Sequence, residues 1–188
     1  MNYRSMDTNT KHLMQREALS QADLQVLWRL ESGVLRIDSA GSDAGSDFVR
    51  LALPGDVLGV ESLVGVKDRL VVRAITPARL VLVVLLEEGE RMQLLMNAVM
   101  QGHQRCREVV SLRTDSAPVR LKRLLHMLAN GDPVDTGEPI ACTLPSLHDM
   151  ATVINATPET VCRVLRSLRQ LNLLQQREPR AVLGGASA

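Results

Sequence analysis

The sequence predicts an α+β protein in which a β-rich N-terminal half is followed by one long helix and a C-terminal helix-turn-helix unit. Short strand-like runs fill residues 24–86 and are separated by turn signals about every 8–12 residues, which is typical of a small barrel or sandwich. Residues 87–112 carry apolar side chains at helical spacing. Residues 146–171 form two short amphipathic patterns joined by one turn residue. We therefore expect three units, at residues 1–86, 87–115 and 116–188.

Turn chemistry divides the N-terminal half into elements. Strands are expected on both sides of a turn at Glu31-Ser32-Gly33, and Pro54-Gly55-Asp56 is a second turn because proline and glycine supply the backbone angles that a turn needs. The remaining expected elements are a polar loop at 39–47, a strand at 48–53, a tight apolar segment at 59–65, an alternating strand at 69–75 and a continuous aliphatic strand at 80–86.

The long helix carries a row of side chains at alternating steps of four and three residues, which is the spacing of a coiled-coil seam. The row consists of Met92, Met96, Val99, His103, Cys106 and Val110. Two interpretations are open: the row pairs with the same helix of a second copy, or it packs against the barrel of its own chain. Residues 114–118 break the helical pattern, and Asp115 or Ser116 is expected to cap the next helix at 119–130. A loop at 131–139 and a strand at 140–144 follow.

The first helix of the C-terminal motif has a clear beginning and end. Ser146 is the expected N-cap, with Asp149 at the position of a capping-box partner. Asn155 is the expected turn residue, because asparagine tolerates the left-handed conformation that a tight turn demands. The buried stripe between them is expected to comprise Leu147, Met150, Ala151 and Ile154.

The second helix is expected to start from Thr157 as N-cap, with Pro158 in the first position, where no amide donor is missed. Its buried stripe is expected to comprise Val161, Val164, Leu165, Leu168 and Leu171. The opposite face carries Glu159, Cys162, Arg163, Arg166 and Arg169. A helical hairpin buried in a core is the alternative, but three arginines against one glutamate favour DNA. Glu159 and Arg163 suit cytosine and guanine edges in the major groove, and a short hairpin at 173–182 is expected as a wing.

Composition limits the other possibilities. Lys plus Arg is 22 and Asp plus Glu is 21 in 188 residues, so attraction to DNA must come from local patches. One Phe, one Tyr and one Trp make stacking on single-stranded bases unexpected. Three widely spaced cysteines without a Cys-x-x-Cys motif disfavour disulfides and structural zinc. The absence of a long apolar run and the polar N-terminus predict a cytoplasmic protein without a membrane segment.

Several short motifs resemble those of the Crp/Fnr family of bacterial transcription regulators, from about Arg16 onward. They are Leu30-Glu31-Ser32-Gly33-Val34, Pro54-Gly55-Asp56-Val57-Leu58-Gly59, Arg120-Leu121 at the opening of the DNA-domain helix, and Leu171-Asn172-Leu173-Leu174 after the recognition helix. The resemblance implies an N-terminal antiparallel β-roll (a cupin-like barrel), a long dimerisation helix and a C-terminal winged helix-turn-helix. The segment before Leu24 is short for this family.

The resemblance also implies a homodimer that presents two recognition helices to a near-palindromic duplex, with RNA polymerase as a further partner. Glu159, Cys162 and Arg163 would then face bases. The expected backbone contacts come from Ser146, His148, Thr157, Thr160 and Arg169, with Arg166 on the same face. Pro158 stands where guanine-reading relatives often carry arginine, and Cys162 where serine or glycine is usual, so a different preferred site is expected.

Family members that bind cyclic nucleotides carry a glutamate after the barrel glycine and an arginine followed by serine or threonine. Here Val60 follows Gly59 and Leu70 follows Arg69, so cyclic AMP is not expected. Glu61 would point away if this segment were a strand. Gly59, Val60, Glu61 and Arg69 remain candidates for another anionic metabolite, and the Gly59-Val60 pair weakly resembles relatives that sense two-oxoglutarate.

Other cofactors and functions have less support. No cysteine cluster near the N-terminus could hold an iron–sulfur centre. Haem would have to use His12, His103 or Cys106, and a histidine on a helix seam is more often structural. No catalytic constellation is recognisable, so an enzyme is not expected. The alternative to a DNA-binding regulator is a metabolite-binding sensory module that acts through protein partners.

Overall fold

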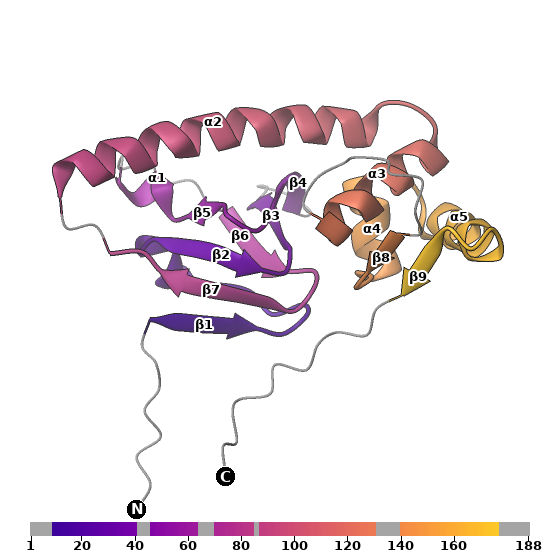
Figure 1. Cartoon of the computed structure of the whole chain (residues 1–188), viewed down its shortest axis with the longest axis horizontal. Helices are drawn as coiled ribbons and strands as arrows, with labels where there is room; N and C mark the ends of the chain where they lie inside the picture. The colour runs from indigo at the N-terminus through magenta and orange to yellow at the C-terminus, as the bar shows by residue number, and fades with distance from the viewer. Residues whose placement is uncertain (1–8, 41–45, 64–69, 85–86, 131–139, 177–188) are drawn as a thin grey trace, which may run out of the picture.

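The computed structural model describes residues 9–40, 46–63, 70–84, 87–130 and 140–176. Figure 1 shows sheets at the N-terminal end, helices at the C-terminal end, and one long helix, α2 (Glu88–Arg113), running above both. The α+β fold class expected from the sequence is confirmed. In this part of the chain no helix is both long enough and apolar enough to cross a membrane.

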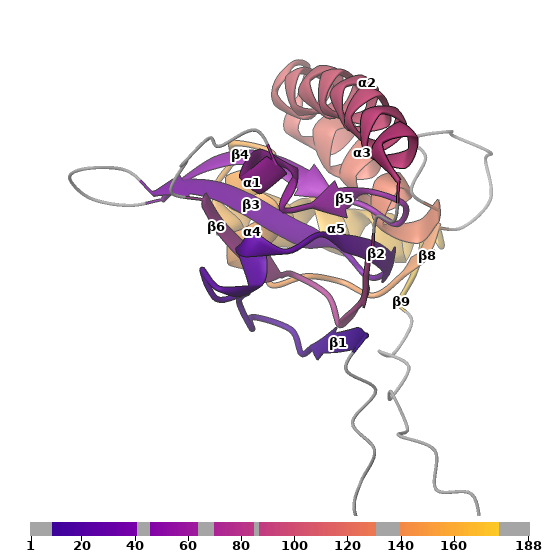
Figure 2. The same ribbon diagram turned by 90° about the vertical axis from the view of Figure 1, so that its left-hand side faces the viewer.

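Two antiparallel sheets form the N-terminal half, which we call the β-roll. One sheet has the order β1-β7-β2-β5 and the other the order β4-β3-β6. Figure 2 shows the roll below α2. The strands are β1 (Thr10–Leu13), β2 (Trp28–Ser32), β3 (Leu35–Ala40), β4 (Ser46–Ala52), β5 (Val57–Leu58), β6 (Leu70–Ala74) and β7 (Ala78–Leu82), with a 3₁₀ turn at Asp23–Gln25 and a helical turn, α1 (Val60–Leu63).

The predicted turn between β2 and β3 depends on Gly33. This residue has φ +84°, and a Cβ atom there would lie 2.2 Å from the carbonyl oxygen of Pro77. A side chain is therefore excluded both by the left-handed backbone and by the close approach of another loop. The glycine passes the chain from one sheet to the other, because β2 and β3 pair with different strands.

Three expectations for the roll were wrong in detail. Strand β1 was missed, because it is a polar edge strand in which only Leu13 is buried. The strand expected at 80–86 ends at Leu82, and Val84 is 63% exposed, since it faces a groove beside α2 rather than the core. The segment after Gly59 is the helical turn α1 rather than a strand, so the strand-based direction expected for Glu61 does not apply.

Helices form the C-terminal unit, residues 117–176. It contains α3 (Ala117–Asn130), α4 (Leu147–Val153) and α5 (Pro158–Gln170), with a small sheet of β8 (Ile140–Cys142) and β9 (Leu174–Gln176). β8 and β9 pair in parallel. The remainder of the expected wing and the loop at 131–139 lie outside the described residues.

Two apolar clusters hold the molecule together. The first fills the roll and includes Leu30, Leu35, Ile37 and Leu80. The second joins the roll to the C-terminal unit. It contains Val34, Phe48, Leu51, Leu53 and Ile75 from the roll, Leu112 from α2, and Leu121, Leu124, Met150, Val161 and Leu165 from the C-terminal helices, among others. The roll and the C-terminal unit therefore share a core within one chain.

Candidate nucleic-acid interface

Helices α4 and α5 form the predicted helix-turn-helix. The Ser146 hydroxyl accepts a hydrogen bond from the Asp149 backbone N–H at 3.1 Å, which caps α4. Asn155 in the turn has φ +50°, the left-handed conformation expected for it. Arg120 of α3 stabilises the turn, because its Nη1 donates to the carbonyl oxygens of Ile154 at 2.6 Å and Asn155 at 3.2 Å. The sequence indicated Arg120 only as part of a family motif and did not predict this role.

The start of α5 is built as expected. The Thr157 hydroxyl accepts from the Thr160 backbone N–H at 3.3 Å, and Pro158 occupies the first turn. Glu159 lies in the same turn and is fully exposed. Its own backbone N–H and the Thr157 hydroxyl bond to its carboxylate and hold the pKa of Glu159 below the ordinary 4.5. The helix therefore presents an ionised acceptor at its N-terminal end at neutral pH.

The outer face of α5 is open to solvent. Glu159, Arg163, Arg166 and Arg169 are exposed, and Thr160 and Cys162 are half-buried. The buried face consists of Val161, Leu165 and Leu168. Leu171 was expected in this stripe but is 66% exposed, because it follows the end of the helix. These arginines are thus exposed to solvent and give α5 a positive outer face.

A shallow hollow of about 410 Å³ lies at the N-terminal end of α5. It is lined by Leu147, Pro158, Glu159, Cys162, Arg163 and Arg166. Leu147 was predicted to be buried but is 40% exposed, because its place on α4 faces this hollow rather than the core. An apolar side chain beside the arginines is the residue type that contacts a thymine methyl group in a major groove.

Two other predicted contact residues lie on α4 or at its start. His148 is exposed on α4, whereas Ser146 is half-buried. The Ser146 hydroxyl also donates to Asp149 Oδ2 at 2.6 Å, so its hydrogen-bonding capacity is largely used inside the protein. Asp149 itself is buried against the roll, which the capping-box pattern did not predict.

Residues 119–183 match the family model of the Crp-like helix-turn-helix domain. This part of the chain is a Crp-like helix-turn-helix domain. The resemblance to the Crp/Fnr family seen in the sequence motifs is confirmed, and the C-terminal unit is called the Crp-like domain below.

Solved structures extend the similarity to the whole fold. A CRP-family transcriptional regulator from Thermus thermophilus is 25% identical, with a TM-score of 0.68 over 90% of this chain and 89% of that one. A second CRP/FNR-family regulator from the same organism gives 19% identity and a TM-score of 0.61 over 90% of each chain. FixK2 from Bradyrhizobium japonicum gives 20% and 0.58 over 95% of this chain and 88% of its own. No curated protein matches the sequence.

The row of seam residues on α2 faces solvent in the single chain. Met92, Met96, Val99 and Val110 are 59%, 60%, 69% and 62% exposed, and His103 and Cys106 are exposed as well. The alternative in which this row packs against the roll of its own chain is therefore wrong. A different face of α2, with Leu94, Arg105, Glu108 and Leu112, makes that contact.

Ion pairs anchor α2 to the roll. The Arg105 guanidinium donates to both carboxylate oxygens of Asp56, at 2.9 and 3.0 Å, and to Glu108 at 2.7 Å. Burial alone would lower the pKa of Arg105, but the bonds to Asp56 and Glu108 outweigh it and raise that pKa. Arg50 Nη1 lies 3.9 Å from Asp56 Oδ2, and burial lowers the pKa of Arg50. Asp56 therefore ties the Pro54-Gly55-Asp56 turn to the helix that connects the roll with the Crp-like domain.

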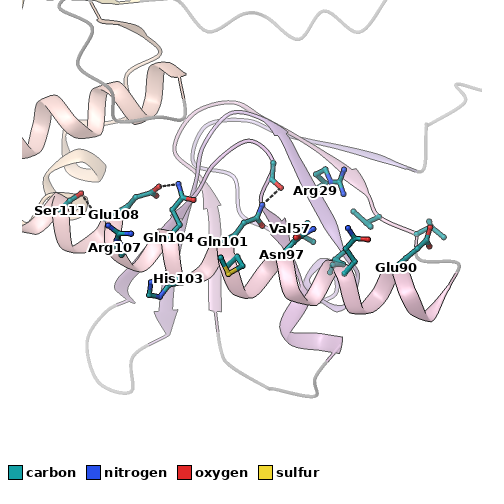
Figure 3. Close-up of a pocket in the computed structure, with 16 residues that line it drawn as sticks. Arg29, Val57, Glu90, Asn97, Gln101, His103, Gln104, Arg107, Glu108 and Ser111 are labelled. Atoms are coloured by element: carbon teal, nitrogen blue, oxygen red, sulfur yellow. Dashed lines mark hydrogen bonds between the residues drawn. The ribbon is translucent and has the colours of Figure 1, made fainter.

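A groove of about 990 Å³ runs along one side of α2 (Figure 3). Its lining includes Arg29 and Val57 from the roll and Asn97, Met100 and His103 from α2. Gln101 Nε2 donates across the groove to the Gly55 carbonyl oxygen at 3.3 Å. Of the predicted metabolite-binding residues that the structure describes, Gly59, Val60 and Glu61 do not line this groove.

The predicted ligand residues are divided between the described and undescribed parts of the chain. Gly59 is buried, Val60 and Glu61 are half-buried on α1, and Arg69 lies outside the described residues. The haem candidates are not brought together, since His12 lies on β1, on the opposite side of the roll from α2 with His103 and Cys106. Among the described residues, no three His, Cys, Asp or Glu side chains are grouped so that they could hold a metal ion.

Proposed function

We propose that this chain is a sequence-specific transcription regulator that binds a near-palindromic duplex as a homodimer. The observation that carries the proposal is α5, a capped helix with an exposed arginine face inside a Crp-like domain. A helix of this kind enters the major groove with its N-terminal residues towards base edges. Three units would share the work. They are a sensor or effector β-roll at residues 1–86, a dimerisation helix at 87–115 and a DNA-binding domain at 116–188.

The proposed roles follow position along α5. Glu159, Cys162 and Arg163 lie at its N-terminal end and would face base edges, with Glu159 accepting from cytosine and Arg163 donating to guanine. The remaining predicted contact residues would hold phosphates, which sets register without selecting sequence. They are His148, Thr157, Thr160, Arg166 and Arg169. The Ser146 hydroxyl is not assigned a phosphate, because it already donates to Asp149 and accepts from its backbone N–H.

Dimerisation through α2 is supported by the exposed seam. Four large apolar side chains at heptad spacing are each more than half exposed, and burying such a row against a second copy removes apolar surface from water. A parallel pair of helices would place two α5 helices on the same side of a duplex, where half-sites about 34 Å apart match one helical repeat.

We further propose that cyclic AMP is not the effector and that RNA polymerase is a partner on DNA. Val60 in place of a glutamate removes the carboxylate that would meet the ribose hydroxyls. The interior of the roll is also filled by an apolar cluster, which includes Leu30, Leu35 and Leu80. An anionic metabolite held by residues among Gly59, Val60, Glu61 and Arg69 remains the alternative effector.

Selection of duplexes from a random pool by the full-length protein tests the proposal. We expect enriched sites with two inverted half-sites and affinity that falls steeply with salt. Arg163→Ala together with Glu159→Ala should abolish the choice of sequence while the protein stays folded. Enrichment of no sequence by a folded wild-type protein would instead favour a sensory module that acts through protein partners.

A further inference from the structure

A buried charge cluster joins the Crp-like domain to the β-roll. Asp149, in the first turn of α4, is only 2% exposed. Its Oδ1 is paired with Arg73 Nη2 of β6 and lies 3.5 Å from Arg36 Nη1 of β3. Its Oδ2 accepts the hydrogen bond from the Ser146 hydroxyl at 2.6 Å. We call Asp149, Ser146, Arg36 and Arg73 the Asp149 cluster.

Burial of the charged groups restricts how α4 can lie on the roll. Arg36 is also buried, with its Nε bonded to Asp38 at 2.6 Å and its guanidinium carbon 5.8 Å from the centre of the Phe48 ring. Phe48 belongs to the apolar cluster that also contains Met150 of α4. A carboxylate taken out of water needs its charge partners in a defined geometry, because an unpaired buried charge is strongly unfavourable. The roll surface at Arg36 and Arg73 therefore accepts α4 in one orientation.

Capping alone does not account for Asp149. The backbone N–H of Asp149 already completes the Ser146 cap, and that bond does not need its side chain. The carboxylate is directed instead at two arginines from strands 76 or more residues earlier in the chain, as the Arg73 pair shows. The side chain thus serves a contact between domains.

The orientation of α5 depends on this contact. Helices α4 and α5 pack together and share the buried residues Met150, Ile154 and Val161. The covalent connection between α2 and α3 is short, from Thr114 to Ser116. It is held by Arg123, whose Nη1 donates to the Ser111 carbonyl oxygen at 2.9 Å and to Asp115 at 2.7 Å. None of the exposed residues Glu159, Arg163 and Arg166 on α5 takes part in the Asp149 cluster.

We propose that Asp149, Arg36 and Arg73 are positioning residues for DNA recognition: their buried ion pair fixes the angle of the Crp-like domain on the roll, and so the separation of the two α5 helices in a dimer. This inference rests on the proposed function. It assigns a role in DNA binding to two arginines of the roll, Arg36 on β3 and Arg73 on β6, that lie outside the helix-turn-helix.

The test compares duplexes with one and two half-sites, using the site obtained by selection and full-length protein. Arg73→Gln is the main variant, because Arg73 lies on β6, outside the helix-turn-helix, so the sequences of α4 and α5 are unchanged. Arg79→Gln is the matched control, since Arg79 is an arginine of the same roll that pairs with Glu31 at 2.8 Å on the surface. Circular dichroism checks that both variants are folded, and Asp149→Asn tests the other side of the pair.

A dimer binds two half-sites on one duplex more tightly than one, but only if the separation of its α5 helices matches the spacing of the half-sites. Arg73→Gln should disturb that separation and therefore weaken binding to the two-site duplex about tenfold or more. Binding to a single half-site should stay within about twofold of wild type, because α5 itself is unchanged. The dependence on spacer length should also broaden, with duplexes lengthened or shortened by one base pair bound almost as well as the best one. Arg79→Gln should behave as wild type in all three measurements.

Other results would overturn the inference. Equal losses on single and paired half-sites would mean that Arg73 supports the fold of the recognition unit rather than its placement. Unchanged binding and spacer preference in both Arg73→Gln and Asp149→Asn would mean that the cluster has no role in recognition. Either result leaves the proposed function standing, whereas a folded wild-type protein that selects no duplex would remove both.

Discussion

Arg163 and Arg169 lie on the same exposed face of α5 but are expected to act differently. Arg163→Ala should cost about 1–3 kcal/mol of binding free energy and relax the preference at one base position. Arg169→Ala, near the C-terminal end, should weaken binding evenly across sequences and reduce the salt slope by about 1. Fluorescence anisotropy over a salt series on matched and mismatched duplexes separates the two effects. A uniform loss in both variants would place Arg163 on the phosphates instead.

Gly33 and Gly55 allow a matched test of backbone geometry in the roll. Both have left-handed φ, +84° and +96°, but only Gly33 has another chain segment where a Cβ would lie. Gly55→Ala should cost about 1 kcal/mol from the backbone conformation alone. Gly33→Ala should cost clearly more, because the added methyl group meets the Pro77 carbonyl at 2.2 Å. Urea denaturation measures both, and equal losses would contradict the steric part.

At the scale of elements, α2 has two faces with different tasks. One face is tied to the roll through Asp56 and Arg105, and the other carries the exposed seam. Val99→Asp places a charge at the centre of the seam and should dissociate a dimer and weaken DNA binding, without unfolding the roll. Met14→Asp is the control, since Met14 is 68% exposed and directly follows β1, which lies on the opposite side of the roll from α2 (Figure 1). Sedimentation and circular dichroism decide the result, and an unchanged dimer in Val99→Asp would reject the seam.

Elements with a strong local signal were predictable from the sequence. The α4–α5 motif is marked by Ser146, Asn155, Thr157 and Pro158, each of which fixes a helix end through its own hydrogen bonds or backbone angles. The long helix was predicted nearly to the residue, because its row of side chains keeps the alternating four-three spacing from Met92 to Val110. β1 was missed because its stability comes from pairing with β7, a partner more than sixty residues away, and not from an apolar pattern of its own.

Tertiary contacts explain the remaining errors in the candidate site. Leu147 and Leu171 have the right spacing for a core stripe, but the packing of α4 on α5 ends before it reaches them. The Arg120 contact with the α4–α5 turn and the Asp149 cluster each join residues at least 34 positions apart. No local pattern encodes such pairs, so a single sequence indicated neither.

At the scale of the whole molecule, the Asp149 cluster should make stability depend on acid. Burial alone would raise the pKa of Asp149, but the hydrogen bonds from Arg73 and Ser146 and the charge of Arg36 together lower it below 3.8. A carboxylate whose folded pKa is lowered stabilises the fold above its unfolded pKa, and this contribution is lost as the pH falls towards the folded value. The sign is therefore a loss of stability in acid.

Asp149→Asn should be less stable than wild type near neutral pH, with a difference that narrows below about pH 4, the ordinary range of an aspartate. Urea denaturation at a series of pH values measures this. Asp23 also has a lowered pKa, through its bonds to Lys11 and Ser20, and its acid sensitivity should remain in the variant. A difference that stays constant down to pH 3 would show that the charge of Asp149 contributes nothing to the folded state.

The apolar cluster that spans Phe48, Leu51, Leu112 and Leu124 has a practical consequence. Cleaving the chain at the short link between α2 and α3 would expose apolar surface on both fragments, because each fragment supplies part of a common interior. A recombinant C-terminal fragment should therefore precipitate or melt at a much lower temperature than the intact polypeptide. Calorimetry on the intact polypeptide should correspondingly record one heat-absorption peak.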